Sequence, residues 1–166
     1  MISDIKKPKI VFTDAATVSQ DDISLNPIKK LGELVCYGST SPEMLRERIA
    51  DADIVLCNKT KITREDMEAA PRLSCIALFA TGYNNIDTVA AAERRIAVCN
   101  AGSYSTNAVA QHTFALLLEL CSRVGGYNDF VREGGWKSSS LFSVFRYPMT
   151  ELYGKTFGIV GLGSIG

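Results

Sequence analysis

The stretch DIVLCNKTKITREDMEAAPRLSCIALFATGYNN, residues 53–85, contains a complete strand–helix–strand unit. Its two apolar runs, Asp53 to Cys57 and Leu73 to Phe79, are continuous rather than alternating. Such runs are typical of strands that are covered on both faces. Between them, Thr63 to Asp66 is close to a capping box and predicts a helix that ends near Pro71. We expect the two strands to be parallel, because a helix between strands provides the crossover that parallel pairing requires.

The same unit recurs on both sides of this stretch. Further strands are expected at Lys9 to Phe12, Glu33 to Tyr37 and Ile96 to Cys99, and further helices at Pro42 to Ala50 and Thr88 to Arg95. Strands that alternate with short helices predict an α/β fold built on a parallel sheet. We assign residues 1–100 to this domain.

A long apolar helix is expected next, from Thr106 or Asn107 to Arg123, ended by the pair Gly125-Gly126. Apolar side chains leave little of its circumference polar, so the helix needs cover on most sides. The pattern fits a central core helix and a helix buried by a second subunit equally well. A surface excursion follows, with a short helix near Tyr127 to Arg132, and the helix and excursion together form a segment over residues 101–150.

Residues 151–166 read as the start of a second domain. The apolar run from Phe157 to Val160 predicts a strand, and Gly161, Gly163 and Gly166 follow it with the spacing G-x-G-x-x-G. In a dinucleotide-binding domain this spacing lets a strand turn sharply into a helix whose first amides face a pyrophosphate.

Composition excludes several classes of protein. The 166 residues include 18 basic and 18 acidic side chains, and no basic block stands out, so a nucleic-acid or acidic membrane partner is not expected. No run is long enough to cross a bilayer. Five cysteines without a C-x-x-C pair argue against both a disulfide framework and a metal site, and predict buried, reduced thiols in a cytoplasmic protein.

Three loops that follow expected strands are candidates for a binding site, because ligands of open parallel sheets bind beyond the carboxyl ends of the strands. These loops are Asn58 to Thr60, Ala80 to Asn85 and Asn100 to Ser103. A glycine at position 82 lets a ligand approach the backbone, and Lys59 could face a carboxylate. Ordinary turn chemistry explains the same residues, so the loops alone leave both interpretations open. His112, the only histidine, lies on the long helix, and we assign it no catalytic role.

Four motifs together resemble those of the D-2-hydroxyacid dehydrogenases, NAD(P)-dependent enzymes that interconvert 2-keto acids and D-2-hydroxy acids. The motifs are ATGYNNID (80–87), AVCNAGSYSTNAVAQHTFALLLEL (97–120), VREGGW (131–136) and ELYGKTFGIVGLGSIG (151–166). The resemblance is to the N-terminal half of the family, and is strongest to its glycerate dehydrogenase (hydroxypyruvate reductase) branch. It implies a flavodoxin-like parallel sheet that binds substrate, a dimerisation helix and the truncated start of a Rossmann domain.

The resemblance also implies roles for individual residues. The loop whose amides hold the substrate carboxylate matches Thr81 and Gly82, and its neighbouring wall matches Asn58, Lys59 and Thr60. A contact to the nicotinamide end of the cofactor matches Thr106. The pyrophosphate turn matches Gly161, Gly163, Ser164, Ile165 and Gly166. The long helix matches the interface of a homodimer.

The family's catalytic Arg, Glu and His match no position in this chain, so no catalytic residue is assigned. We expect an oxidoreductase that uses NAD or NADP, with NADH favoured, and reduces hydroxypyruvate or glyoxylate to D-glycerate or glycolate. We expect these 166 residues to be inactive by themselves. A second class stays open, in which the chain is a non-catalytic module that only dimerises, through Asn107 to Arg123, or binds a small carboxylate.

Overall fold

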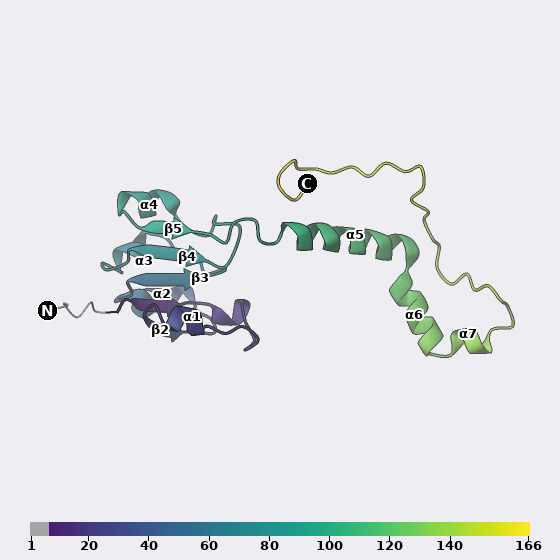
Figure 1. Ribbon diagram of the computed structural model, residues 1–166, viewed down its shortest axis with the longest axis horizontal. Helices are drawn as coiled ribbons and strands as arrows, with labels where there is room; N and C mark the ends of the chain where they lie inside the picture. Colours follow the sequence, from purple (N-terminus) through teal and green to yellow (C-terminus); the bar gives the residue numbers. More distant parts are fainter. Residues whose placement is uncertain (1–6) are drawn as a thin grey trace. The chain divides into compact units, whose positions relative to one another are not determined.

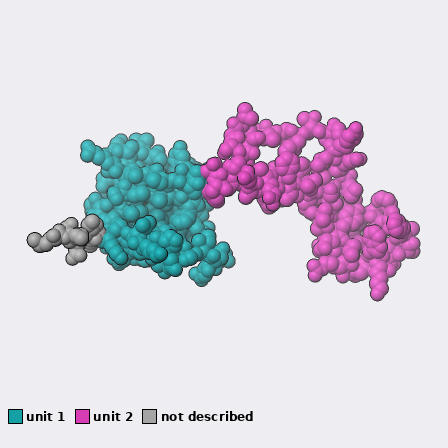
Figure 2. All heavy atoms as spheres, viewed as in Figure 1, with its two compact units in different colours: residues 1–102 teal, residues 103–166 magenta. Residues whose placement is uncertain are grey.

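A computed structural model describes residues 7–166, and the chain separates between Gly102 and Ser103 into two units (Figures 1 and 2). The first unit contains a five-stranded parallel sheet whose order is β2-β1-β3-β4-β5. The strands are β1 (Lys9–Phe12), β2 (Glu33–Cys36), β3 (Ile54–Cys57), β4 (Cys75–Leu78) and β5 (Ala97–Cys99). The predicted α/β class is therefore confirmed, and the strand order is that of the flavodoxin-like folds.

Short helices connect the strands. They are the 3-10 helix η1 (Ala15–Thr17) and the α-helices α1 (Asn26–Lys29), α2 (Pro42–Ile49), α3 (Arg64–Glu68) and α4 (Thr88–Glu93). The predicted capping box is present at the start of α3, where the backbone N–H of Thr63 donates to the Asp66 carboxylate over 2.9 Å. Asp87 caps α4 by accepting the N–H of Ala90. These caps fix where the chain leaves the loops that follow β3 and β4.

Alternate residues of the central strands β1, β3 and β4 face two separate hydrophobic clusters. The larger cluster, on one face of the sheet, combines Val55 and Ile76 with side chains of α2, α3 and α4. On the opposite face, Ile10, Phe12 and Leu56 pack with partly buried side chains that include Ile28 of α1. The core of the first unit therefore lies on both faces of β1 and β3.

Cover on both faces was predicted for every strand, and this is wrong at the two edge strands, β2 and β5. Cys36 of β2 is exposed, as are Ala97 and Cys99 of β5, and Cys75 of the neighbouring β4 is only half-buried. The five cysteines are free, as predicted, but Cys57 is the one that is buried.

The second unit consists of α5 (Thr106–Ser122), α6 (Val124–Arg132), α7 (Gly135–Ser138) and an extended segment. The long helix ends at Arg123 as predicted, but the glycine pair predicted to end it does not, because Gly125 and Gly126 lie inside α6. Arg123 ends α5 instead, with a left-handed φ of 52° and an N–H that donates to the Glu119 carbonyl over 2.8 Å. The ring of the half-buried Tyr147 lies where a Cβ on Gly126 would be, which favours a glycine at this position.

Residues 139–166 contain no helix or strand in the structure, so the strand predicted at Phe157 to Val160 is not formed. A strand needs a neighbour to accept and donate its backbone hydrogen bonds, and within the described residues none lies beside this run. The Phe157 ring instead contacts Phe114 of α5, with 5.8 Å between the ring centroids. Among residues 7–166, no helix combines the length and the apolar character needed to cross a membrane.

Candidate functional site

The carboxyl ends of β1, β3, β4 and β5 meet at one edge of the sheet, and the loops predicted as binding elements leave from this edge. The N–H of Phe79 donates to the Cys57 carbonyl over 2.8 Å, so the loops after β3 and β4 start side by side. The structure therefore brings together two of the predicted sets, Asn58 to Thr60 and Thr81 to Gly82, as neighbouring segments of the first unit.

The loop from Asn58 to Thr60 is held by Asp14, a residue that the sequence analysis missed. Asp14 follows β1 and is only 4% exposed. Its carboxylate accepts three consecutive backbone N–H groups, from Asn58 over 2.9 Å, from Lys59 over 2.6 Å and from Thr60 over 2.9 Å. An acidic residue directly after a buried strand, at the edge where the other loops leave, is the signal that could have identified it.

Thr60 is held from two further directions. The hydroxyl of Thr13 lies 2.9 Å from that of Thr60, and the side-chain amide of Asn85 donates to the Thr60 carbonyl over 2.8 Å. Two residues after Thr60, the N–H of Ile62 donates to the backbone carbonyl of Asn85 over 2.9 Å. The loop after β3 is therefore fixed both to the end of β1 and to the loop after β4.

The loop after β4 presents unused donors. Its carbonyls are occupied, because the side chain of Asn100 donates to Thr81 over 2.7 Å and the N–H of Ala101 donates to Ala80 over 2.9 Å. Within the described part of the chain, the N–H groups of Thr81 and Gly82 have no acceptor, and both residues are exposed. Exposed, unused amides in a loop are able to bind an anion.

A cation lies on the adjoining loop. Lys59 is exposed, and its ammonium group makes no ion pair with any residue in the range 7–166. Its backbone is fixed by Asp14, so the long side chain starts from a defined position at the same edge as Thr81 and Gly82. Free amides and an ammonium group are the donors that bind carboxylates in proteins, and both kinds lie on loops at this end of the sheet.

Cys57 is the thiol nearest in sequence to this site. Burial, with a smaller contribution from the Asp14 charge, raises its pKa from the ordinary value of 9.0 to about 12. The thiol is therefore uncharged at neutral pH and is not available as a nucleophile. The side chain serves instead as a small apolar member of the larger cluster.

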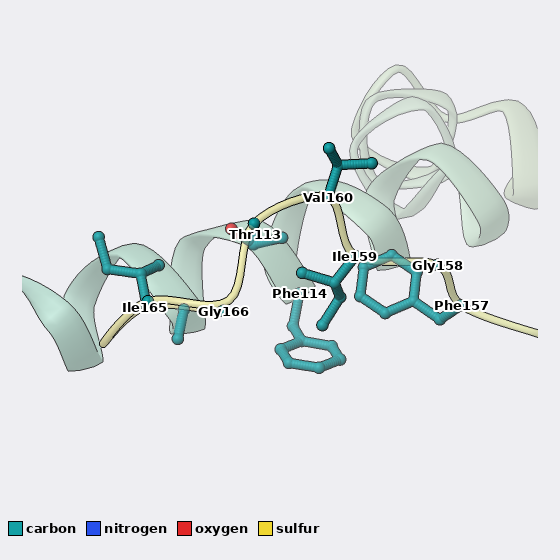
Figure 3. A pocket seen from close by; sticks show the side chains of 11 residues that line it. Thr113, Phe114, Phe157, Gly158, Ile159, Val160, Ile165 and Gly166 are labelled. Atoms are coloured by element: carbon teal, nitrogen blue, oxygen red, sulfur yellow. The ribbon is translucent and has the colours of Figure 1, made fainter.

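The residues predicted to bind the cofactor lie in the second unit. Thr106 is the first residue of α5, and its hydroxyl donates to the Ser103 carbonyl over 3.1 Å. The run from Phe157 to Gly161, together with Gly163, Ile165 and Gly166, lines a groove of about 460 Å³ against Ala110, Thr113 and Phe114 of α5. Figure 3 shows the Phe114 ring below this run and the Thr113 side chain next to the backbone trace.

The glycines fit a tight turn that approaches a ligand closely. Gly161 has a φ of 118°, which side-chain-bearing residues rarely adopt, and a Cβ on Gly166 would clash with the Gly161 carbonyl oxygen. A Cβ on Gly163 would meet nothing within 4 Å, so the space beside it is open. Ser164 and Ile165 complete the turn. The helix that would follow the turn is not part of residues 7–166. His112 is an exposed residue of α5.

Known proteins that match this sequence include 2-hydroxyacid dehydrogenases and related reductases. The family model described as "D-isomer specific 2-hydroxyacid dehydrogenase, catalytic domain" matches residues 10–156. A hydroxypyruvate reductase from Blautia hydrogenotrophica is 42% identical over 161 residues, and a glycerate dehydrogenase from Methylorubrum extorquens is 33% identical over 159 residues. Each match covers 95% of this chain and 50% of the relative, so the chain spans about half the length of these proteins.

Solved structures share the fold. An NADPH-dependent glyoxylate/hydroxypyruvate reductase from Sinorhizobium meliloti, solved with NADP and malonate, matches with a TM-score of 0.72 and 26% identity, over 97% of this chain and 48% of that one. An acyclic imino acid reductase, solved with NADPH and D-Arg, matches with a TM-score of 0.75 and 28% identity, over 95% of this chain and 50% of that one.

Proposed function

The chain belongs to the family of D-isomer specific 2-hydroxyacid dehydrogenases, and on that premise we propose that its first unit binds the 2-keto or 2-hydroxy acid substrate of an NAD(P)-dependent oxidoreductase. The observation that carries the proposal is the pair of exposed, unused N–H groups at Thr81 and Gly82, with the unpaired Lys59 on the adjoining loop. The amides would bind the substrate carboxylate, and Asn58 to Thr60 would form the neighbouring wall of the site.

For the substrate, we propose hydroxypyruvate and glyoxylate, reduced to D-glycerate and glycolate. The support comes from relatives that are named hydroxypyruvate reductase, glycerate dehydrogenase and glyoxylate reductase. Both acids are small enough for a site formed by two short loops. We propose NADH as the favoured cofactor.

The cofactor would be held by the second unit. Gly161, Gly163, Ser164, Ile165 and Gly166 would hold its pyrophosphate, for which the glycine conformations described above are suited, and Thr106 would contact the nicotinamide end. When bound, the nicotinamide supplies or accepts the hydride. This chain's own residues bind and orient the carboxylate, and its part in catalysis is therefore positioning.

We also propose that residues 1–166 have no dehydrogenase activity by themselves. The acid or base that moves the proton and the cation that orients the keto acid match no residue here, and the one histidine is exposed on α5. The measurement is the loss of NADH absorbance when the purified chain is mixed with hydroxypyruvate or glyoxylate. We expect a rate equal to that of buffer, and turnover clearly above it would contradict the proposal.

For the assembly, we propose a homodimer formed through α5. Its side chains Phe114, Leu116, Leu118 and Leu120 are each at least 50% exposed. Exposed apolar surface of this kind marks interaction sites. A monomeric mass in light scattering would contradict the dimer. We propose a cytoplasmic location, since five free cysteines suit a reducing compartment.

The substrate site is tested by an NMR titration of the ¹⁵N-labelled chain with hydroxypyruvate. We expect the largest shifts at the N–H groups of Thr81 and Gly82, with smaller shifts at Lys59, because these donors have no acceptor in the free protein. Glycolaldehyde, which has no carboxylate, is the matched control ligand and should shift these signals little. Shifts that are larger elsewhere, or equal for the two ligands, would overturn the assignment of the carboxylate site.

A further inference from the structure

We propose that Asp14 is a positioning residue for the substrate site, which sets the conformation of the loop from Asn58 to Thr60 and with it the position of Lys59. The inference rests on the proposed function, since it concerns the wall of the same carboxylate site. Asp14 touches no substrate in this account. It acts through the backbone of the loop that forms the wall.

The geometry is that of an anion bound in a nest of amides. Three consecutive N–H groups converge on the Asp14 carboxylate over 2.6 to 2.9 Å, and the Lys59 contact is the shortest. Successive N–H groups that point into one concavity form an anion site. Here the protein's own carboxylate fills it, and hydrogen bonds to a charged acceptor are the strong ones.

Removing the Asp14 carboxylate would loosen the loop from Asn58 to Thr60 and leave the packing of the hydrophobic core largely unchanged. Asp14 is not a member of either hydrophobic cluster, and its side chain bonds only to the loop and to the neighbouring hydroxyl of Thr13, 3.4 Å away, within residues 7–166. Its backbone carbonyl accepts the N–H and the hydroxyl of Thr17, and these bonds do not need the carboxylate. Without it, three N–H groups at a partly buried position would lose their acceptor. Thr60 would still be held by Asn85, and Asn58 by the hydrogen bonds of its side chain to Thr17. Within residues 7–166, no other hydrogen bond holds Lys59.

The location of Lys59 therefore depends on Asp14. Its ammonium group has no ion-pair partner within residues 7–166, so only its backbone determines where the charge lies. A mobile loop would spread that charge over many positions. This would weaken the binding of a carboxylate between Lys59 and the amides of Thr81 and Gly82. The expected consequence is a weaker affinity for keto acids in a protein that remains folded.

The test compares three variants of the 166-residue chain by NMR. Asp14→Asn keeps the size of the side chain and removes its charge, and Asp14→Ala removes the acceptor. Asp53→Asn is the matched control, because the Asp53 carboxylate also accepts a backbone N–H, that of Lys9 over 2.7 Å, but lies before β3 at the opposite edge of the sheet. Amide hydrogen exchange and the Kd for hydroxypyruvate are measured for each.

We expect Asp14→Asn to speed exchange at the N–H groups of Asn58, Lys59 and Thr60 by at least about tenfold, as the loss of charged hydrogen bonds predicts. The Kd for hydroxypyruvate should rise by about fivefold or more, and the exchange of the β3 amide of Val55 should stay within twofold of its original rate. Asp53→Asn should leave the Kd unchanged.

Formate provides a second measurement if Asp14→Ala is less well folded. A formate ion has the size and charge to occupy the vacated nest, and it should slow exchange at the same three N–H groups in Asp14→Ala but not in the original chain. Exchange is the readout, because formate also competes for the keto acid site.

The outcomes separate the two proposals. If the original chain binds hydroxypyruvate and Asp14→Asn binds it equally well, the role of Asp14 is overturned and the proposed function stands. Unchanged exchange at Asn58 to Thr60 in both Asp14 variants would overturn it as well. If the original chain binds no keto acid, the proposed substrate site is overturned, and the inference with it.

Discussion

Replacing Phe12 with alanine is expected to lower the free energy of unfolding of the first unit by about 3–5 kcal/mol. The Phe12 side chain is 0% exposed, and its ring stacks on that of Phe79 with 5.0 Å between the centroids. Ile10 and Leu56 complete the small cluster on this face of the sheet. The side chains around the ring, which include the partly buried Ile28, would close only part of the cavity that it leaves, because surrounding structure relaxes incompletely. The loss is a large part of the roughly 5–15 kcal/mol that stabilises a typical domain.

Amide exchange at Val55 and Ile76 measures this change, because these amides are protected until the sheet opens. The method reports on the first unit and does not assume that both units unfold together. Phe145→Ala makes the same chemical change at a side chain that is 91% exposed. We expect it to lower the free energy of unfolding by less than about 0.5 kcal/mol. Equal costs for the two variants would show that the cluster around Phe12 is not packed as described.

Gly82→Val is expected to raise the KM for hydroxypyruvate by about tenfold or more. One hydrogen bond to a charged group contributes about 1.5–3 kcal/mol, and about 1.4 kcal/mol corresponds to a factor of ten in binding. The valine side chain would occupy the exposed side of the loop, beside the unused N–H groups. The fold should survive, because a Cβ on Gly82 meets its nearest atom, Oδ1 of Asn84, at an ordinary contact distance of 3.4 Å.

The measurement uses a chimera in which this chain replaces the matching half of the hydroxypyruvate reductase relative. Gly38→Val is the control, because Gly38 follows β2 at the same edge of the sheet and a Cβ there meets only Ala16, at 3.8 Å. We expect Gly38→Val to leave the KM for the keto acid unchanged, and both variants to bind NADH as the original chimera does. Equal loss of NADH binding and keto acid binding in Gly82→Val would mean that the loop is only structural.

The first unit could be predicted closely because its signals are local. Each strand is a run of apolar side chains, so β1 lies at the predicted Lys9 to Phe12 and the other strands within a few residues of their predicted bounds. The caps are local as well: the N–H of Thr63 donates to the Asp66 carboxylate, and the Asp87 carboxylate accepts the N–H of Ala90, each three residues away. What could not be predicted is the exposure of β5, which depends on which face of the sheet each helix packs against.

The second unit was predicted less well, for physical reasons. The apolar pattern identifies α5 and its end at Arg123, but not how the helix ends, because no residue preference indicates the left-handed conformation of Arg123. The run from Phe157 to Val160 has the composition of a strand, and composition does not provide the neighbouring strand that its backbone requires.

The candidate site could likewise be predicted from sequence only in part. The polar loops after β3 and β4 could be placed from sequence, because parallel strands bring their carboxyl ends to one edge. The role of Asp14 could not, since its three N–H donors lie 44 to 46 residues further along the chain. The assignment of Thr81 and Gly82 to a carboxylate stays a prediction, now supported by their unused N–H groups.

The most direct test of the account is the rate at which the chimera oxidises NADH with hydroxypyruvate, compared with that of the 166-residue chain alone. We expect the chimera to reduce hydroxypyruvate and glyoxylate, with a KM that Gly82→Val raises, and the chain alone to show no turnover. A chimera that is folded and binds NADH, yet reduces neither acid, would contradict the claim that these loops form the substrate site of a 2-hydroxyacid dehydrogenase.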